Sequence, residues 1–147
     1  MIFLTEQEYK HIRNLAWDLL IDSNTSSLPV NILEIAKLYD LEHLVDDGKP
    51  LYENALSVSD GILKVFGLGR EGLSKYLAVR ILAPVIVFKE LNVKSAKEVS
   101  DLSGLPIDIA AQRYERLLML QERSAFETSR LESIVLSQFK GWISRRF

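Results

Sequence analysis

Cysteine is absent from the sequence, and histidine occurs only twice, as His11 and His43. The lack of cysteine excludes disulfides, thiolate zinc sites and cysteine nucleophiles, and it is compatible with a reducing cytosol. A zinc site made of nitrogen and oxygen ligands usually needs two or three histidines in a fixed arrangement, whereas these two are predicted on separate elements. The sequence therefore gives no support for catalysis, and we expect neither a metal nor another cofactor.

Long apolar runs and a dominant charge are also lacking. The longest apolar run, Ile81 to Phe88, covers about half of a membrane span. The N-terminus, MIFLTEQEYK, turns acidic too early for a signal peptide. With 18 basic and 20 acidic residues the net charge is −2, so no overall basic field attracts nucleic acid or an anionic membrane. We expect a cytoplasmic protein without membrane contact.

The sequence does contain helical periodicity with recognisable helix starts. Thr5 and Glu8 form a capping-box pattern before apolar residues spaced as on one helix face, and Ser95 and Glu98 repeat that pattern. Pro29 stands where a second helix is expected to begin. The other expected helices cover about residues 6–22, 73–83, 95–103, 107–123 and 128–142.

The segment before residue 73 predicts a small β element in an otherwise mainly α protein. The apolar stretch Ile62 to Phe66, bounded by Gly61 and Gly67, favours a short strand within a two- or three-stranded element near residues 41–66. Residues 84–91 fit either a strand or a helical continuation that starts at Pro84. The expected fold class is therefore mainly α, or α+β with a minor β element.

A glycine-rich motif follows the expected strand. Gly67, Gly69 and Gly72 give the pattern G-x-G-x-x-G, and Glu90 follows 18 residues after Gly72. Such glycines let the backbone approach a pyrophosphate at a helix N-terminus. The Glu90 carboxylate would accept a hydrogen bond from a ribose hydroxyl. A dinucleotide fold needs several more parallel strands than this chain offers. We therefore favour the interpretation as a glycine-rich connector, and nucleotide binding is the alternative.

Residues 95–120 match the plan of a helix–turn–helix unit. On its second helix Gln112, Arg113 and Arg116 have the chemistry to read bases, hold phosphates or contact a protein partner. Residues 89–123 contain six basic and six acidic residues, and Asp108 stands at the helix start, where phosphates would approach. DNA binding therefore remains an alternative to a helical hairpin that only packs.

Two aromatic residues of the last expected helix, Phe139 and Trp142, are candidate anchors for a protein partner. In that interpretation the exposed faces of the 107–123 and 128–142 helices form the contact surface. Ordinary packing of both rings against the second helix is the other interpretation, and we favour it.

Three stretches, in order along the chain, resemble one known family. They are Leu28-Pro29-Val30-Asn31-Ile32 with Ile35-Ala36, then Leu77 to Pro84, then residues 91–99 together with Arg113, Glu115, Arg116 and Leu117. The series resembles the second helix, the "FARRLLAP" helix end and the C-terminal helical hairpin of the ImmA/IrrE-type metallopeptidases of bacteria and mobile elements. The resemblance implies a zincin-like helical core remnant over residues 1–92. It implies a helical hairpin and tail helix over residues 93–147, in one compact unit with the core.

The departures from that family concern its metal site. Family members carry HExxH on a helix, where two histidines one turn apart bind zinc and the glutamate is the general base. No HExxH occurs here, and the position of the third ligand falls at about Leu73. The resemblance therefore implies a non-catalytic relative that acts through protein–protein contacts. Because family members often work beside helix–turn–helix repressors of phages and mobile elements, it also implies a repressor-type regulator as the partner.

Overall fold

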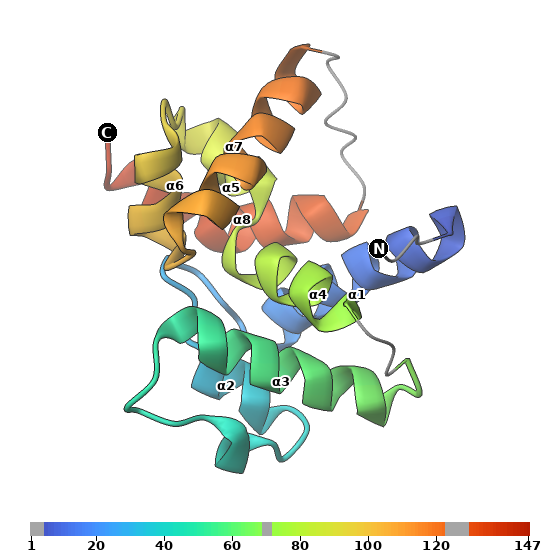
Figure 1. Ribbon diagram of the computed structural model, residues 1–147. Coiled ribbons are helices and arrows are strands. Elements are labelled where there is room, and N and C mark those ends of the chain that lie inside the picture. The colour runs from blue at the N-terminus through green and yellow to red at the C-terminus, as the bar shows by residue number, and fades with distance from the viewer. Residues whose placement is uncertain (1–4, 69–71, 123–129) are drawn as a thin grey trace.

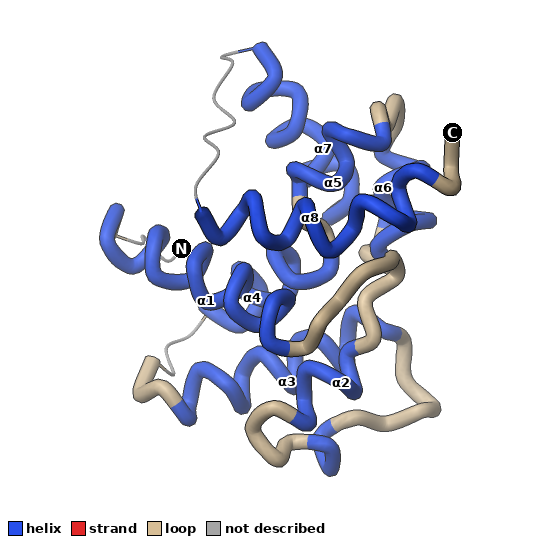
Figure 2. The backbone as a smooth tube through the Cα atoms, turned by 180° about the vertical axis from the view of Figure 1, so that it is seen from behind, coloured by secondary structure: helices blue, strands red, loops and turns tan. Residues whose placement is uncertain are grey.

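The computed structural model describes residues 5–68, 72–122 and 130–147. No residue in those ranges lies in a strand (Figure 2), so the mainly α class is confirmed and the expected β element is not found there. The elements are α1 (Glu6–Asp22), α2 (Ile32–Lys37), the short 3₁₀ helix η1 (Glu42–Leu44), α3 (Leu51–Val65), α4 (Leu73–Leu82), α5 (Val85–Leu91), α6 (Ala96–Ser103), α7 (Ile107–Glu122) and α8 (Arg130–Ser144).

The helices are arranged on two sides of α1 and α4, which contact each other near the centre of the molecule (Figure 1). On one side α2 and α3 lie together, and α3 packs against α4. On the other side α8 packs against α1 and α5, while α6 and α7 form a hairpin that contacts this group through α5. The central pair is therefore covered by both groups.

Two helix starts follow the capping patterns of the sequence. The Thr5 Oγ1 accepts from the Glu8 N–H at 3.1 Å, and a Glu8 carboxylate oxygen accepts from the Thr5 N–H at 3.2 Å. At α6 the Ser95 Oγ accepts from the Glu98 N–H at 3.2 Å. These bonds satisfy N–H groups that have no partner within the helix, so the predicted starts of α1 and α6 are confirmed.

The strand predicted at Ile62 to Phe66 is wrong, because these residues end α3 and include its C-cap. Ala55 and Val58 are buried together with Ile62, at the three- and four-residue spacing of one helix face. Gly61 lies inside the helix and does not interrupt it. A Cβ at Gly61 would come within 2.8 Å of a side-chain carbon of Leu44, so the glycine lets η1 pack closely on α3.

Two prolines were candidates for the starts of helices, and the expectation holds at Pro84 but not at Pro29. Pro29 does not begin α2, which starts at Ile32 after Asn31, whose side-chain oxygen accepts from the Leu33 N–H at 3.2 Å. Pro84, in contrast, directly precedes α5. Of the two interpretations of residues 84–91, the helical one is therefore confirmed, and the missing N–H of proline costs nothing at a helix start.

The hydrophobic core runs without a break across the predicted boundary at residues 92 and 93. Leu19 and Phe88 from the first segment and Leu117 and Phe139 from the second are buried in the same apolar cluster. Each fully buried side chain of this size contributes about 1.5–3 kcal/mol. The two predicted segments therefore share one core.

A side chain of α8 ties this helix to the end of α1. The Gln138 amide nitrogen donates to the carbonyls of Leu20 and Thr25, at 3.0 and 2.9 Å, across 118 and 113 residues of sequence. The Leu20 carbonyl lies in the last turn of α1 and the Thr25 carbonyl in the loop that follows, so this one amide holds α8 against the end of α1.

Among the described helices, none combines the length and the apolar character that crossing a membrane requires.

Candidate functional site

A cavity of about 570 Å³ opens between α1, α4 and α7. Its wall carries four basic side chains, and we name it the cationic cavity. Arg80 and Lys75 come from α4, and Arg113 and Arg116 lie one helical turn apart on α7. The described residues that line it are Tyr9, Gly72, Lys75, Tyr76, Val79, Arg80, Ile109, Gln112, Arg113 and Arg116.

Arg113 is the most deeply placed of these cations. Only 9% of its surface is exposed, and its Nε–H donates to the Ala83 carbonyl at 2.8 Å, which ties α7 to the end of α4. Burial is the main cause that lowers the pKa of Arg113 to about 9, and the positive charge of Arg80 adds to it. At neutral pH the guanidinium is therefore still charged, although the fold disfavours that charge.

Arg80 is partly shielded from water. Its guanidinium carbon lies 4.5 Å from the centroid of the Tyr9 ring, which is the geometry of a cation–π contact. Burial lowers the pKa of Arg80, the contact with Tyr9 opposes that shift, and the charges of Arg116 and Arg13 reinforce it. The arginines of the cavity are thus close enough to repel one another.

No acidic side chain belongs to the described lining of the cationic cavity. The ion pairs found in the described ranges involve other cations, namely Lys10, Lys37, Lys64, Lys89 and Lys97. Buried charges in proteins are usually paired, because removing an ion from water costs several kcal/mol. The cavity therefore presents positive charge that the described part of the chain leaves without a carboxylate.

The structure brings together residues from two of the sequence-predicted sites. Gln112, Arg113 and Arg116, predicted as DNA or partner contacts, line the cationic cavity with Gly72, the last glycine of the G-x-G-x-x-G motif. Gly67 follows the end of α3 with a φ of +70°, and Gly69 lies outside the described residues.

Other predicted residues lie away from the cavity. Glu90 is exposed on α5, 3.8 Å from the Lys89 Nζ, and does not line the cationic cavity. Leu73, the position that matches the family's third zinc ligand, is buried in the core. Phe139 is fully buried and packs edge to face with the partly exposed Trp142, at 6.1 Å between ring centroids. The Phe139 ring is therefore a core residue and is not exposed to a partner.

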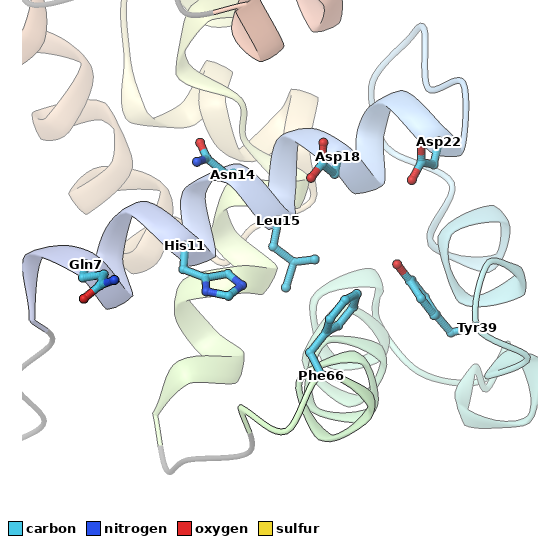
Figure 3. Close-up of a pocket in the computed structure, with 8 residues that line it drawn as sticks. All are labelled: Gln7, His11, Asn14, Leu15, Asp18, Asp22, Tyr39 and Phe66. Atoms are coloured by element: carbon cyan, nitrogen blue, oxygen red, sulfur yellow. The ribbon is translucent and has the colours of Figure 1, made fainter.

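A second cavity, of about 630 Å³, lies along most of the length of α1, from Gln7 to Asp22, and was not predicted (Figure 3). Burial, followed by the charge of Asp22, raises the pKa of Asp18. The side of this cavity that faces α1 is formed by Tyr39 and Phe66. Their rings contact each other edge to face, with 5.4 Å between the ring centroids. Its lining consists of Gln7, His11, Asn14, Leu15, Asp18, Asp22, Tyr39 and Phe66.

In the described ranges no three side chains of histidine, aspartate or glutamate are grouped so that they could hold a metal ion. His43 is exposed on η1, on a different element from His11.

No protein-family model, curated protein or solved structure matches this chain. The resemblance to the ImmA/IrrE-type metallopeptidases therefore stays a prediction from the sequence. The candidate site has to be interpreted from its own geometry and charge.

Proposed function

We propose that this chain is a binding protein and that the cationic cavity holds an anionic group of its ligand. The observation that carries the proposal is the buried Arg113, grouped with Arg80 and Arg116 in a cavity whose described lining has no carboxylate. An anion in the cavity would supply the missing countercharge. It would also accept hydrogen bonds from guanidinium groups, which favour oxyanions in a two-pronged geometry.

The arginines of the cationic cavity carry an energetic penalty that a bound anion would lower. Burial, and after it the charges of the neighbouring arginines, lower the pKa values of Arg80 and Arg113 against an opposing effect of Tyr9, so each positive charge is unfavourable in the absence of a ligand. A hydrogen bond to a charged group contributes about 1.5–3 kcal/mol. Two or three such bonds to one anion would repay the penalty and give measurable affinity.

A cavity ligand fits the geometry better than duplex DNA. Arg113 is turned into the protein, and the exposed residues of α7 include Asp108 and Glu115. Carboxylates on that face would repel the phosphates of a DNA groove. Helix α7 therefore lacks the outward basic face that a recognition helix needs.

The proposal agrees with the expectation of a non-catalytic relative of the metallopeptidases, because binding an anion needs neither a metal nor a nucleophile. A repressor-type protein partner stays a hypothesis that rests on the resemblance alone. Such a partner could use the cationic cavity only by presenting an acidic group to it.

The test is binding of inorganic phosphate and pyrophosphate, measured by isothermal titration and thermal unfolding against sodium chloride of equal ionic strength. Phosphate at a hundred times its dissociation constant should add about 2.7 kcal/mol to the free energy of unfolding. Arg116→Gln should weaken binding about tenfold without destabilising the free protein, because it relieves repulsion with Arg80 and Arg113.

Lys140→Gln is the matched control, because Lys140 is exposed on α8 and does not line the cavity. This variant should bind phosphate like the unmodified protein. Equal stabilisation by phosphate and chloride, or equal losses in both variants, would contradict the proposal.

A further inference from the structure

The cationic cavity is larger and more varied than a site for a bare anion. Its volume of about 570 Å³ falls within the range of about 300–1,000 Å³ that is usual for small-molecule pockets. Beside the cations, the wall holds Tyr76, Val79 and Ile109. An inorganic phosphate would occupy the cationic part and leave these three side chains in contact with water.

The cationic part is suited to a doubly charged oxyanion. Arg113 and Arg116 of α7 line the same cavity as Arg80 of α4, close enough for the charge of Arg116 to lower the pKa values of the other two. Arg113 is nine-tenths buried, so an anion bound to it would be held away from bulk water, in surroundings where electrostatic attraction is stronger. Guanidinium groups offer paired N–H donors that match the oxygens of a phosphate.

The charge favours a phosphate monoester over a single carboxylate. A monoester carries about −1.5 to −2 at neutral pH and three acceptor oxygens, whereas a carboxylate carries one charge. Lys75, Arg80, Arg113 and Arg116 together offer four positive charges. A dianion therefore offsets more of their repulsion.

The remaining wall is suited to a flat organic group. Tyr76 is 41% exposed, so its ring offers a surface for stacking. Val79 and Ile109 add apolar contacts, and the Gln112 amide can both donate and accept a hydrogen bond. These residues lie in the same cavity as the cations, so one molecule can contact both parts.

We infer that the ligand of the cationic cavity is a small organic phosphate monoester with a planar ring, of the size of a nucleoside monophosphate. This inference rests on the proposed function. Its phosphate lies against Arg80, Arg113 and Arg116. Its ring lies against Tyr76 and Ile109.

The experiment compares phenyl phosphate and adenosine monophosphate with inorganic phosphate and adenosine, by isothermal titration of the full chain. At least one of the two monoesters should bind ten or more times tighter than inorganic phosphate, and adenosine should not bind. Tyr76→Ala should weaken binding of the tighter monoester about fivefold and leave inorganic phosphate binding unchanged. Phe66→Ala is the control, because Phe66 has a similar exposure, 44%, but lines the second cavity.

Three failures are distinguishable. If inorganic phosphate binds and neither monoester binds tighter, the inference about the ring is overturned while the proposed function stands. If Tyr76→Ala and Phe66→Ala weaken monoester binding equally, the assignment of the ring to Tyr76 is overturned. If no phosphate compound binds more than chloride does, the proposed function itself is overturned.

Discussion

Asp18 and Asp22 lie one turn apart on α1 and border the second cavity together (Figure 3). Burial and the neighbouring charge raise the pKa of Asp18 above its ordinary value of 3.8. A carboxyl with a raised pKa in the folded state binds protons more readily there than in the unfolded chain. Its charge therefore costs stability at neutral pH, and the cost disappears as the pH falls below the unfolded value.

Asp18→Asn should accordingly stabilise the protein at pH 7, by up to about 0.5 kcal/mol because the site is exposed to solvent. The gain should shrink toward pH 3.5, where Asp18 is largely protonated in both states. Urea unfolding at the two pH values measures it, with Asp47→Asn in an exposed turn as the control. A gain that is equal or larger at the lower pH would contradict the explanation.

Single residues also show how far the site was predictable. Gln112, Arg113 and Arg116 were identified by their chemistry, but their grouping with Arg80 depends on how α4 packs near α7, which residue spacing alone does not encode. One signal was available. Arg113 lies between Ala110 and Leu117 at the spacing of the buried face of α7, so the sequence pattern itself places this arginine inward.

At the scale of elements, glycine has two opposite roles in the helices of this protein. Gly104 ends α6 with a φ of +80°, and its N–H donates to the Ser100 carbonyl at 2.9 Å. A Cβ there would also meet a side-chain carbon of Leu51 at 2.8 Å. Gly141 lies within α8, where the nearest atom to a Cβ is an Arg145 nitrogen at an ordinary 3.5 Å.

The same substitution should therefore have opposite signs at the two positions. Gly104→Ala should lower the free energy of unfolding by about 1–2 kcal/mol, because L-residues disfavour positive φ. Gly141→Ala should raise it by about 0.5–1 kcal/mol, because alanine loses less backbone freedom in a helix. Chemical denaturation of the two variants provides the comparison, and losses of stability at both positions would show that α8 does not accept a side chain at residue 141.

Elements with a capping residue or a clear apolar stripe were predictable, as α1 and α6 show. The segment of α3 was not, because a glycine such as Gly61 beside a short apolar run indicates an end of structure. Its true role depends on the closeness of Leu41 and Leu44 from another element, which is a tertiary contact. An apolar run such as Ile62 to Phe66 fits a strand or a buried helix equally well when its neighbours are unknown.

For the whole molecule, the continuous core predicts cooperative unfolding. The two tryptophans report on distant parts of the sequence, Trp17 from α1 and Trp142 from α8. Because both helices pack into one core, Trp17→Phe and Trp142→Phe variants should each show a fluorescence transition that coincides with the loss of helical circular dichroism. Midpoints that differ within one variant would indicate that the segments before and after residue 92 unfold separately.

The Gln138 contact has a consequence for synthesis on the ribosome. The chain adds about 5–20 residues per second, so the 118 residues between Leu20 and Gln138 separate their appearance by about 6–24 seconds. During that interval the side of α1 that α8 covers in the finished protein is open to solvent. In the nascent chain, α1 must therefore stay soluble, or be shielded by other proteins, until α8 has been synthesised.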